Sequence, residues 1–224
     1  MPLNWPAFSP ALLIFDCDGV LVDSERLSHA VLQQMLAESG VELSLQETLD
    51  HFMGSSTEGL LATLQALTKR APPADFLVRF RRRYSDSFKT SLAPVPGVVD
   101  LLPTLTLPFC VASNGPHEKM RLTLGHTGLL PHFAGRIFSA QDVSRPKPAP
   151  DLFLHAARSL HAAPQDCLVI EDSATGVAAA KAAGMKVAGY AAMGQARKLR
   201  DAGADILFEN MASLPQLLFK EQTP

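Results

Sequence analysis

Short apolar runs alternate with helical segments over most of this 224-residue chain, and this alternation restricts the fold more than any other feature. The first run, residues 11–15, ends at Asp16. Runs this short and this apolar are typical of parallel strands buried on both faces. Because parallel strands joined by helices require right-handed crossovers, we expect an α/β fold with a doubly wound, Rossmann-like parallel sheet. Further strands are expected at 108–112, 136–138, 168–170, 186–189 and 205–208, with helices at 97–105, 116–127, 148–161, 173–183, 195–202 and 212–220.

One segment, residues 24–92, breaks the alternation because it has helical patterns and no convincing strand. Its length fits about four helices, which can form a small bundle. We therefore expect a small helical cap domain inserted after the first strand, with hinges at Asp23 and 94–96. The expected domains are a Rossmann-like catalytic core of residues 8–22 and 95–224 and a helical cap of residues 23–94.

The expected cap has recognisable helix ends. Ser24 is expected to cap a first helix that carries Leu27, Val31 and Met35 on one face and stops at Gly40. Further helices are expected after a capping box at 44–47, and at 56–70 and 73–92.

Charge and composition exclude several classes of protein. The formal net charge is −2, so no global charge favours nucleic acid or an acidic surface. Three scattered cysteines in apolar runs, Cys17, Cys110 and Cys167, argue for buried thiols and a reducing compartment rather than a disulfide framework. Residues 1–10 do not resemble a signal peptide, and no apolar stretch approaches the ~20 residues that span a bilayer. We expect a cytoplasmic monomer or weak homodimer that binds neither nucleic acid nor membrane.

Some charged residues leave two interpretations open. The basic run Arg79–Arg83 on the last cap helix could attract an anionic substrate or form a solvated helix face. His117 could touch a substrate or be an ordinary surface histidine, and the seven histidines form no metal-like cluster in the sequence.

Two acids follow the first strand: Asp16 ends it and Asp18 lies just beyond. Ligands of open parallel sheets bind beyond the carboxyl ends of the strands. Two such carboxylates repel each other unless a cation or a shared proton stabilises them. The pair can supply an ionised nucleophile and a separate proton carrier. A D-x-D-G pattern also occurs in loops and calcium sites, so its position after a buried strand is what makes it informative.

Two further segments carry groups suited to an anion. Ser113 and Asn114 end the second strand just before a helix, where a hydroxyl and successive backbone N–H groups can bind phosphate. The alternative is that Ser113 only caps the helix that begins near Pro116. Lys147 stands between two prolines, which stiffen its loop, and it is suited to hold a phosphate oxygen and balance nearby carboxylates.

A second pair of acids, Glu171 and Asp172, follows the strand at 168–170. Mg²⁺ prefers hard oxygen ligands and keeps several of its waters, so a few carboxylates suffice to bind it. The alternative is that Asp172 or Ser173 only caps the next helix. Together the four segments place acids, a hydroxyl and a lysine at one edge of the sheet. They predict magnesium-dependent attack on a phosphate ester by Asp16.

In order, the four segments resemble the four motifs of the haloacid dehalogenase superfamily of aspartate-nucleophile phosphatases, and the resemblance covers essentially the whole chain. It rests on D-x-D-G-V-L-V-D-S at 16–24, K-P-A-P-D at 147–151 and E-D-S at 171–173. The insert after Asp23 is similar to the helical cap of the β-phosphoglucomutase-like branch. Residues 111–116 and 119–120 resemble those of bacterial 6-phosphogluconate phosphatases, which implies a sugar or sugar-acid phosphate as substrate.

The resemblance implies a role for each acid. Asp16 is the nucleophile and a Mg²⁺ ligand. Asp18 is the general acid and base, and its backbone carbonyl also binds the metal. Asp172 is a further metal ligand, and Glu171 is either a ligand or a partner of the ligands.

The resemblance also implies how phosphate is held. Ser113 and the backbone N–H of Asn114 bind the transferring phosphoryl group, and Lys147 stabilises charge on the nucleophile and the phosphate. The cap acts as a lid that excludes water from the site.

Other reactions on the same fold are possible alternatives. A dehalogenase lacks the second aspartate and the metal, so Asp18 and Asp172 argue against it. A phosphonatase has a lysine where this chain has Thr57. A β-phosphoglucomutase-type mutase has a cap-hinge histidine where this chain has Ser28, and basic residues where it has Met53 and Thr57. A catalytically inactive binding protein of this fold is the alternative of another class, and the complete set of motif residues argues against it.

Overall fold

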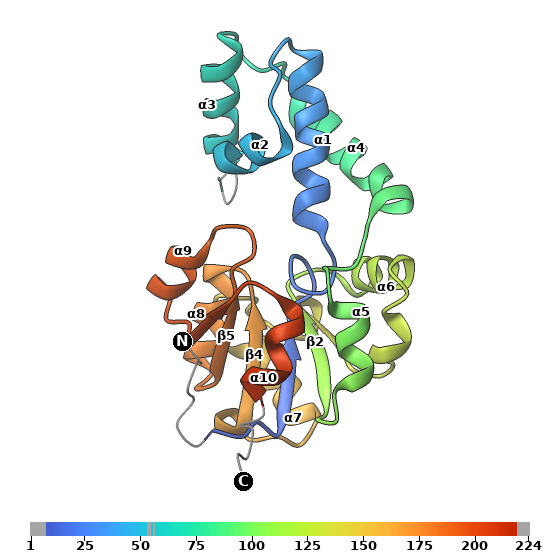
Figure 1. Ribbon diagram of the computed structural model, residues 1–224, viewed down its shortest axis with the longest axis vertical. Coiled ribbons are helices and arrows are strands. Elements are labelled where there is room, and N and C mark those ends of the chain that lie inside the picture. Colours follow the sequence, from blue (N-terminus) through green and yellow to red (C-terminus); the bar gives the residue numbers. More distant parts are fainter. Residues whose placement is uncertain (1–7, 53–54, 56, 219–224) are drawn as a thin grey trace. The chain divides into compact units, whose positions relative to one another are not determined.

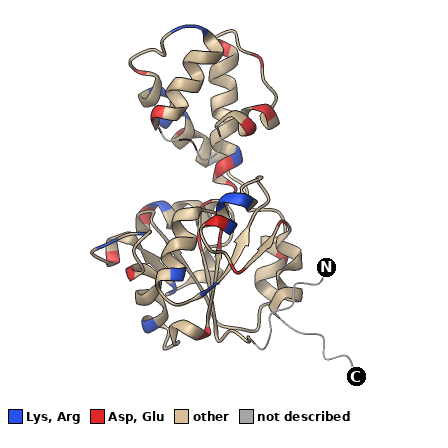
Figure 2. Cartoon of the chain, turned by 90° about the vertical axis from the view of Figure 1, so that its left-hand side faces the viewer, with Lys and Arg blue, Asp and Glu red and all other residues tan. Residues whose placement is uncertain are grey.

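The structure is a computed structural model that describes residues 8–52, 55 and 57–218. The chain divides into two compact units. The core is formed by the chain up to Val22 and from Pro94 onward, and the cap is Asp23–Ala93 (Figure 1). Acidic and basic residues are interspersed along both units (Figure 2). No helix within the described ranges is both long enough and apolar enough to cross a membrane.

The core is built on a six-stranded sheet in the order β3-β2-β1-β4-β5-β6 (Figure 1). Every neighbouring pair is parallel, which confirms the predicted doubly wound sheet. The strand order reverses between β1 and β4, and such a switch point is where open α/β sheets bind ligands. The strands are β1 Leu12–Phe15, β2 Phe109–Ser113, β3 Ile137–Ser139, β4 Cys167–Glu171, β5 Lys186–Tyr190 and β6 Ile206–Phe208.

The central strands are buried along their whole length, which explains their continuous apolar sequences. On one face, Leu12 and Ile14 of β1 pack in a single cluster with Phe153, Val177 and Leu199 from three helices. Each fully buried side chain of this size contributes about 1.5–3 kcal/mol to folding. These three helices are α7 Asp151–Ser159, α8 Ala174–Ala182 and α9 Ala196–Asp201.

Most core helices lie where the sequence predicts them, but several are shorter. The segment 148–150, expected to be helical, forms a turn before Asp151, because a residue that precedes proline is disfavoured in the α conformation. The last two positions of the helix expected at 212–220 lie outside the described residues. The remaining core elements are α5 Val98–Leu101, α6 His117–His126 and α10 Leu214–Leu218, with 3₁₀ turns at Leu102–Thr104, Leu130–Phe133, Ala140–Asp142, Pro164–Asp166 and Met211–Ser213.

Helices of the cap bury one apolar cluster. Val31 and Met35 of α1 pack against Phe52, Leu64 and Phe76 from the other helices. In the basic run, Arg83 Nη1 lies 2.6 Å from Glu38 Oε1, so the run contributes an ion pair within the cap. The cap helices are α1 Ser24–Glu38, α2 Leu45–Phe52, α3 Thr57–Thr68 and α4 Phe76–Ser91.

The start of α1 corrects one prediction. Asp23, not Ser24, is the N-cap: its side chain accepts the Arg26 N–H at 3.3 Å. A carboxylate here also favours the positive end of the helix dipole. The capping box at the start of α2 is as expected, since the Ser44 N–H donates to Glu47 Oε2 at 2.7 Å and the Glu47 N–H donates to Ser44 Oγ at 3.2 Å.

The chain leaves and re-enters the core at neighbouring points. Val22 forms an antiparallel bridge with Pro94, and the Val95 N–H donates to Leu21 O at 2.9 Å. The two connections are therefore held together by backbone hydrogen bonds on the core side.

All three cysteines are free and buried, as predicted. Burial raises the pKa of the Cys167 thiol to about 11, so this thiol remains protonated and unreactive near neutral pH.

Candidate active site

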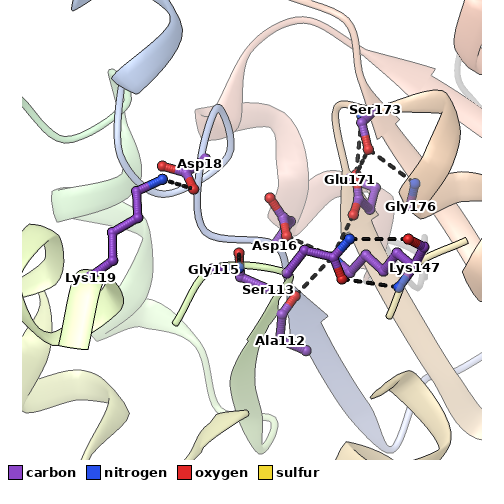
Figure 3. Close-up of polar contacts among 11 residues, drawn as sticks. Asp16, Asp18, Ala112, Ser113, Gly115, Lys119, Lys147, Glu171, Ser173 and Gly176 are labelled. Carbon is purple, nitrogen blue, oxygen red and sulfur yellow. Dashed lines mark hydrogen bonds and ion pairs between the residues drawn. The ribbon is translucent and has the colours of Figure 1, made fainter. Parts of the chain in front are cut away.

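Polar side chains from three strand ends and one loop meet at the carboxyl edge of the sheet (Figure 3). Asp16 directly follows β1, Ser113 is the last residue of β2 and Glu171 is the last residue of β4. Because β1 lies between β2 and β4, Asp16 stands at the centre of this edge. Lys147 reaches the same point from the loop that follows β3. The four sequence segments thus meet at the switch point of the sheet.

Lys147 joins the acids of neighbouring strands. Its Nζ donates to Asp16 Oδ1 at 2.6 Å, to Glu171 Oε1 at 2.7 Å and to Ala112 O at 2.9 Å. All three N–H groups of the ammonium are therefore used. Burial alone would lower the pKa of Lys147, but the two carboxylates raise it above its usual value. The lysine is buried as a cation, which is favourable only because it is fully paired.

Asn114 positions Lys147 through its side chain. The Lys147 N–H donates to Asn114 Oδ1 at 3.0 Å, and Asn114 Nδ2 donates to Lys147 O at 3.1 Å. This pair of bonds fixes the backbone of the proline-flanked loop. No local sequence pattern predicts this contact, because the two residues are 33 positions apart.

Ser113 does not cap the following helix. The N-cap of α6 is Pro116, which has no side chain that can cap, while Ser113 Oγ accepts the Gly115 N–H at 3.2 Å. The capping interpretation is therefore wrong for Ser113. Ser113 is 3% exposed, and its hydroxyl lies at the end of β2 beside the backbone N–H of Gly115.

Glu171 is buried and fixed by donors on both oxygens. Oε1 accepts the bond from Lys147. Oε2 accepts from the Ser173 N–H at 3.0 Å and from the Ser173 hydroxyl at 2.9 Å. Ser173 also caps α8 by accepting the Gly176 N–H at 3.0 Å, so the capping interpretation holds for Ser173. A Cβ on Gly176 would lie 1.7 Å from Glu171 Oε1, so only glycine leaves room for this carboxylate. Because both oxygens already accept hydrogen bonds from the protein, Glu171 can act as a partner of metal ligands as well as a ligand itself.

An acidic cluster fits a hard divalent cation. Asp16, Glu171 and Asp172 each bring one carboxylate oxygen within 4.8 Å of the others. Gly19 makes room for this cluster, because a Cβ there would lie 2.0 Å from Asp172 Oδ2. The backbone of Gly19 also has φ +77°, a conformation that favours glycine. Oxygen donors of this kind and number are what Mg²⁺ takes from a protein.

Burial and neighbouring charges both act on the pKa of Asp16. Burial raises the pKa of Asp16 to about 7, with Lys147 acting in the opposite direction and the Glu171 and Asp18 carboxylates adding to the rise. A cation bound to the cluster would favour the ionised form that a nucleophile requires.

Asp18 is held by a lysine for which the sequence suggested no chemical role. Lys119 Nζ donates to Asp18 Oδ2 at 2.7 Å (Figure 3). The available signal was the position of Lys119 in the first turn of α6, the helix that follows Ser113. His117, by contrast, pairs with Asp142 at 2.8 Å and is 28% exposed, as expected of a surface histidine.

Comparisons with known proteins point to the same phosphate chemistry as the geometry of the site. The chain is 32% identical over 178 residues to the 6-phosphogluconate phosphatase of Escherichia coli (strain K12), covering 78% of this chain and 80% of the relative. It is 30% identical over 176 residues to the fructose-1-phosphate phosphatase of the same organism, covering 77% and 92%. The crystal structure of a HAD family hydrolase from Deinococcus radiodurans R1, with bound phosphate and sodium, aligns with a TM-score of 0.83 at 34% identity, covering 93% and 94%.

The family described as haloacid dehalogenase-like hydrolase matches residues 13–190, a span that contains all four segments of the site. The named relatives are phosphatases of small phosphate esters, that is, phosphoric monoester hydrolases. As the motifs predicted, this chain belongs to the haloacid dehalogenase-like hydrolase family.

Proposed function

We propose that this protein is a magnesium-dependent phosphatase that hydrolyses a sugar or sugar-acid phosphate through an aspartyl-phosphate on Asp16. The observation that carries the proposal is the placement of Asp16 at the centre of the sheet edge, bound to Lys147 and surrounded by further acids. One carboxylate oxygen is held by the lysine, which leaves Oδ2 as the attacking atom.

In the first step, Asp16 attacks the phosphorus in line with the ester oxygen. Lys147 and the donors around Ser113 neutralise charge on the phosphoryl oxygens. Asp18 gives a proton to the leaving alkoxide. In the second step, Asp18 takes a proton from water as the water attacks the aspartyl-phosphate.

Mg²⁺, held by Asp16, Asp172 and the Asp18 backbone carbonyl, would supply further positive charge at the phosphate. Glu171 would act on this centre by keeping Lys147 in place. The cytoplasmic location and the monomer or weak homodimer remain predictions.

The substrate class is supported by the relatives, two of which are named for 6-phosphogluconate and fructose 1-phosphate. A direct test is a screen of sugar, sugar-acid, polyol and nucleotide phosphates with Mg²⁺, ranked by kcat/KM. We expect 6-phosphogluconate or another phosphorylated sugar to rank first. A nucleotide ranking first would contradict the substrate class. Absence of turnover with every ester would favour an inactive binding protein.

A mutase of the β-phosphoglucomutase type is the strongest alternative, and the residues of α1 argue against it. Ser28 occupies the place where such a mutase has its hinge histidine. The next residue, His29, is buried, and its Nδ1 lies 2.8 Å from Glu25 O within the same helix. Thr57 supplies no charge for a second phosphate, and Met53 lies outside the described residues.

We therefore expect release of inorganic phosphate from a sugar phosphate, without interconversion of glucose 1- and 6-phosphates. Recognition of a bisphosphate intermediate favours charged donors at both ends, and Ser28 and Thr57 supply none. The measurement is phosphorus NMR of the enzyme with β-glucose 1-phosphate and catalytic bisphosphate. Formation of the 6-phosphate faster than inorganic phosphate would establish the mutase.

A further inference from the structure

One ion pair in the core has no role in the chemistry described so far. Lys119 Nζ donates to Asp18 Oδ2 at 2.7 Å, across 101 residues of sequence. The other carboxylate oxygen, Asp18 Oδ1, is buried and has no hydrogen-bond partner in the described part of the chain. The two oxygens of this carboxyl group are therefore in different surroundings.

The aliphatic stem of Lys119 lies against the turn that follows Ser113. Its Cδ would lie 3.6 Å from a Cβ built on Gly115, which is ordinary van der Waals contact, so the aliphatic stem runs beside the turn that holds Ser113. The Lys119 side chain is 33% exposed and the Asp18 side chain is 25% exposed. Because both side chains are partly buried, salt in the solvent screens this ion pair less than it screens a fully exposed pair.

The ammonium group of Lys119 can only donate hydrogen bonds, and this decides which oxygen of the Asp18 carboxyl group can carry a proton. Oδ2 faces a donor whether the carboxyl group is ionised or neutral, so it acts as an acceptor in both forms. A proton on Asp18 must then reside on Oδ1, the oxygen that has no protein partner.

We propose that Lys119 is a positioning residue that orients Asp18 so that Oδ1 exchanges protons with the substrate. This inference rests on the proposed function. As Asp16 forms its bond to phosphorus, the bond from phosphorus to the ester oxygen breaks, and that oxygen takes the proton from Oδ1. As water later attacks the phosphorus, its proton returns to Oδ1 and the bond between phosphorus and Asp16 breaks.

The role makes a specific kinetic prediction, because a leaving group needs a proton only when it is basic. Lys119→Met should lower kcat/KM for 6-phosphogluconate or fructose 1-phosphate by about 100-fold, within the usual range of acid catalysis, and for p-nitrophenyl phosphate by less than about threefold. Phenyl phosphate should lie between them. Since kcat/KM covers only the steps up to phosphoryl transfer, hydrolysis of the phosphoenzyme does not obscure the comparison.

Three variants make the test specific. Lys119→Arg should restore part of the alkyl-ester activity, because it keeps a cationic donor. In an Asp18→Asn background, Lys119→Met should cause no further loss of kcat/KM, as expected for two residues that act as a unit. Lys181→Met removes a lysine–aspartate pair of similar exposure, with Asp205 at 2.8 Å, and should leave kcat/KM unchanged for every ester.

Each other outcome contradicts the proposal. Equal losses for all esters would assign Lys119 to phosphate binding or to folding, and no loss would make the pair a surface contact. A further loss in the Asp18→Asn background would show that Lys119 acts independently of Asp18. If the wild-type enzyme with Mg²⁺ hydrolyses none of the esters, the proposed function fails, and this inference fails with it.

Discussion

Asp16→Asn should reduce turnover to less than about 1% of the wild-type kcat, a rise in the barrier of at least ~2.7 kcal/mol. The asparagine amide is not nucleophilic and cannot form the acyl phosphate. It also removes one of the oxygens that we expect to bind Mg²⁺. No other acid in the described ranges ends β1, so no neighbour can take its place without a backbone shift.

The same substitution should leave the fold intact. Asparagine has nearly the same shape as aspartate, so it fills the same space directly after β1. Lys147 keeps its bonds to Glu171 and to Ala112 O. The measurements are kcat under saturating substrate and thermal unfolding without metal. Retention of more than ~1% of kcat would remove Asp16 from the role of nucleophile.

A matched control distinguishes loss of the nucleophile from a general loss of acidic charge. Asp201 ends α9 and forms an exposed pair with Arg197 at 3.7 Å. Asp201→Asn makes the same chemical change outside the four site segments and should leave kcat close to that of the wild type.

Removal of divalent cations should stop catalysis, and added Mg²⁺ should restore it where Ca²⁺ does not. The physical reason is the repulsion among Asp16, Glu171 and Asp172, whose oxygens lie within 4.8 Å of one another. Ca²⁺ takes more ligands in a looser geometry, which does not suit an in-line displacement. Phosphate release should be followed after treatment with a chelator and after titration with each cation. Full activity in excess chelator would contradict the metal requirement.

The metal requirement should also depend on pH. Because burial raises the pKa of Asp16 to about 7, protons compete with the cation for this carboxylate below that pH. The Mg²⁺ concentration that gives half-maximal activity should therefore rise as the pH falls from 8 to 6, by up to about tenfold per pH unit for one competing proton. A half-saturation concentration that stays constant over this range would mean that Asp16 does not release a proton when the metal binds.

Much of the core could be predicted because its signals are local. The six strands are short apolar runs, and the acids that follow them reach one edge through parallel topology alone. The Asn114–Lys147 and Lys119–Asp18 contacts could not be predicted in this way. They join loops and helices that are distant in the sequence, and they depend on how those segments pack in three dimensions.

The smaller errors have local physical causes. Ser24 and Asp23 are both good N-cap residues, and propensity does not decide between neighbours when each can accept the same N–H groups. At 148–150, the helical pattern was favoured although two prolines opposed it. At 148–150 the backbone constraint of the prolines therefore decides the boundary, whereas at 23–24 the choice lies between two capping side chains.

The bridge between Val22 and Pro94 makes the cap a replaceable module. Paired residues in antiparallel backbone have Cα atoms only about 4.5–5.5 Å apart, a gap that a two-residue turn can close. The core can therefore be joined into a continuous chain without the 71 residues of Asp23–Ala93, and its strand order would not change. Insertions of different length and shape can be grafted at the same junction. Such an exchange would leave the reacting groups on the sheet edge as they are.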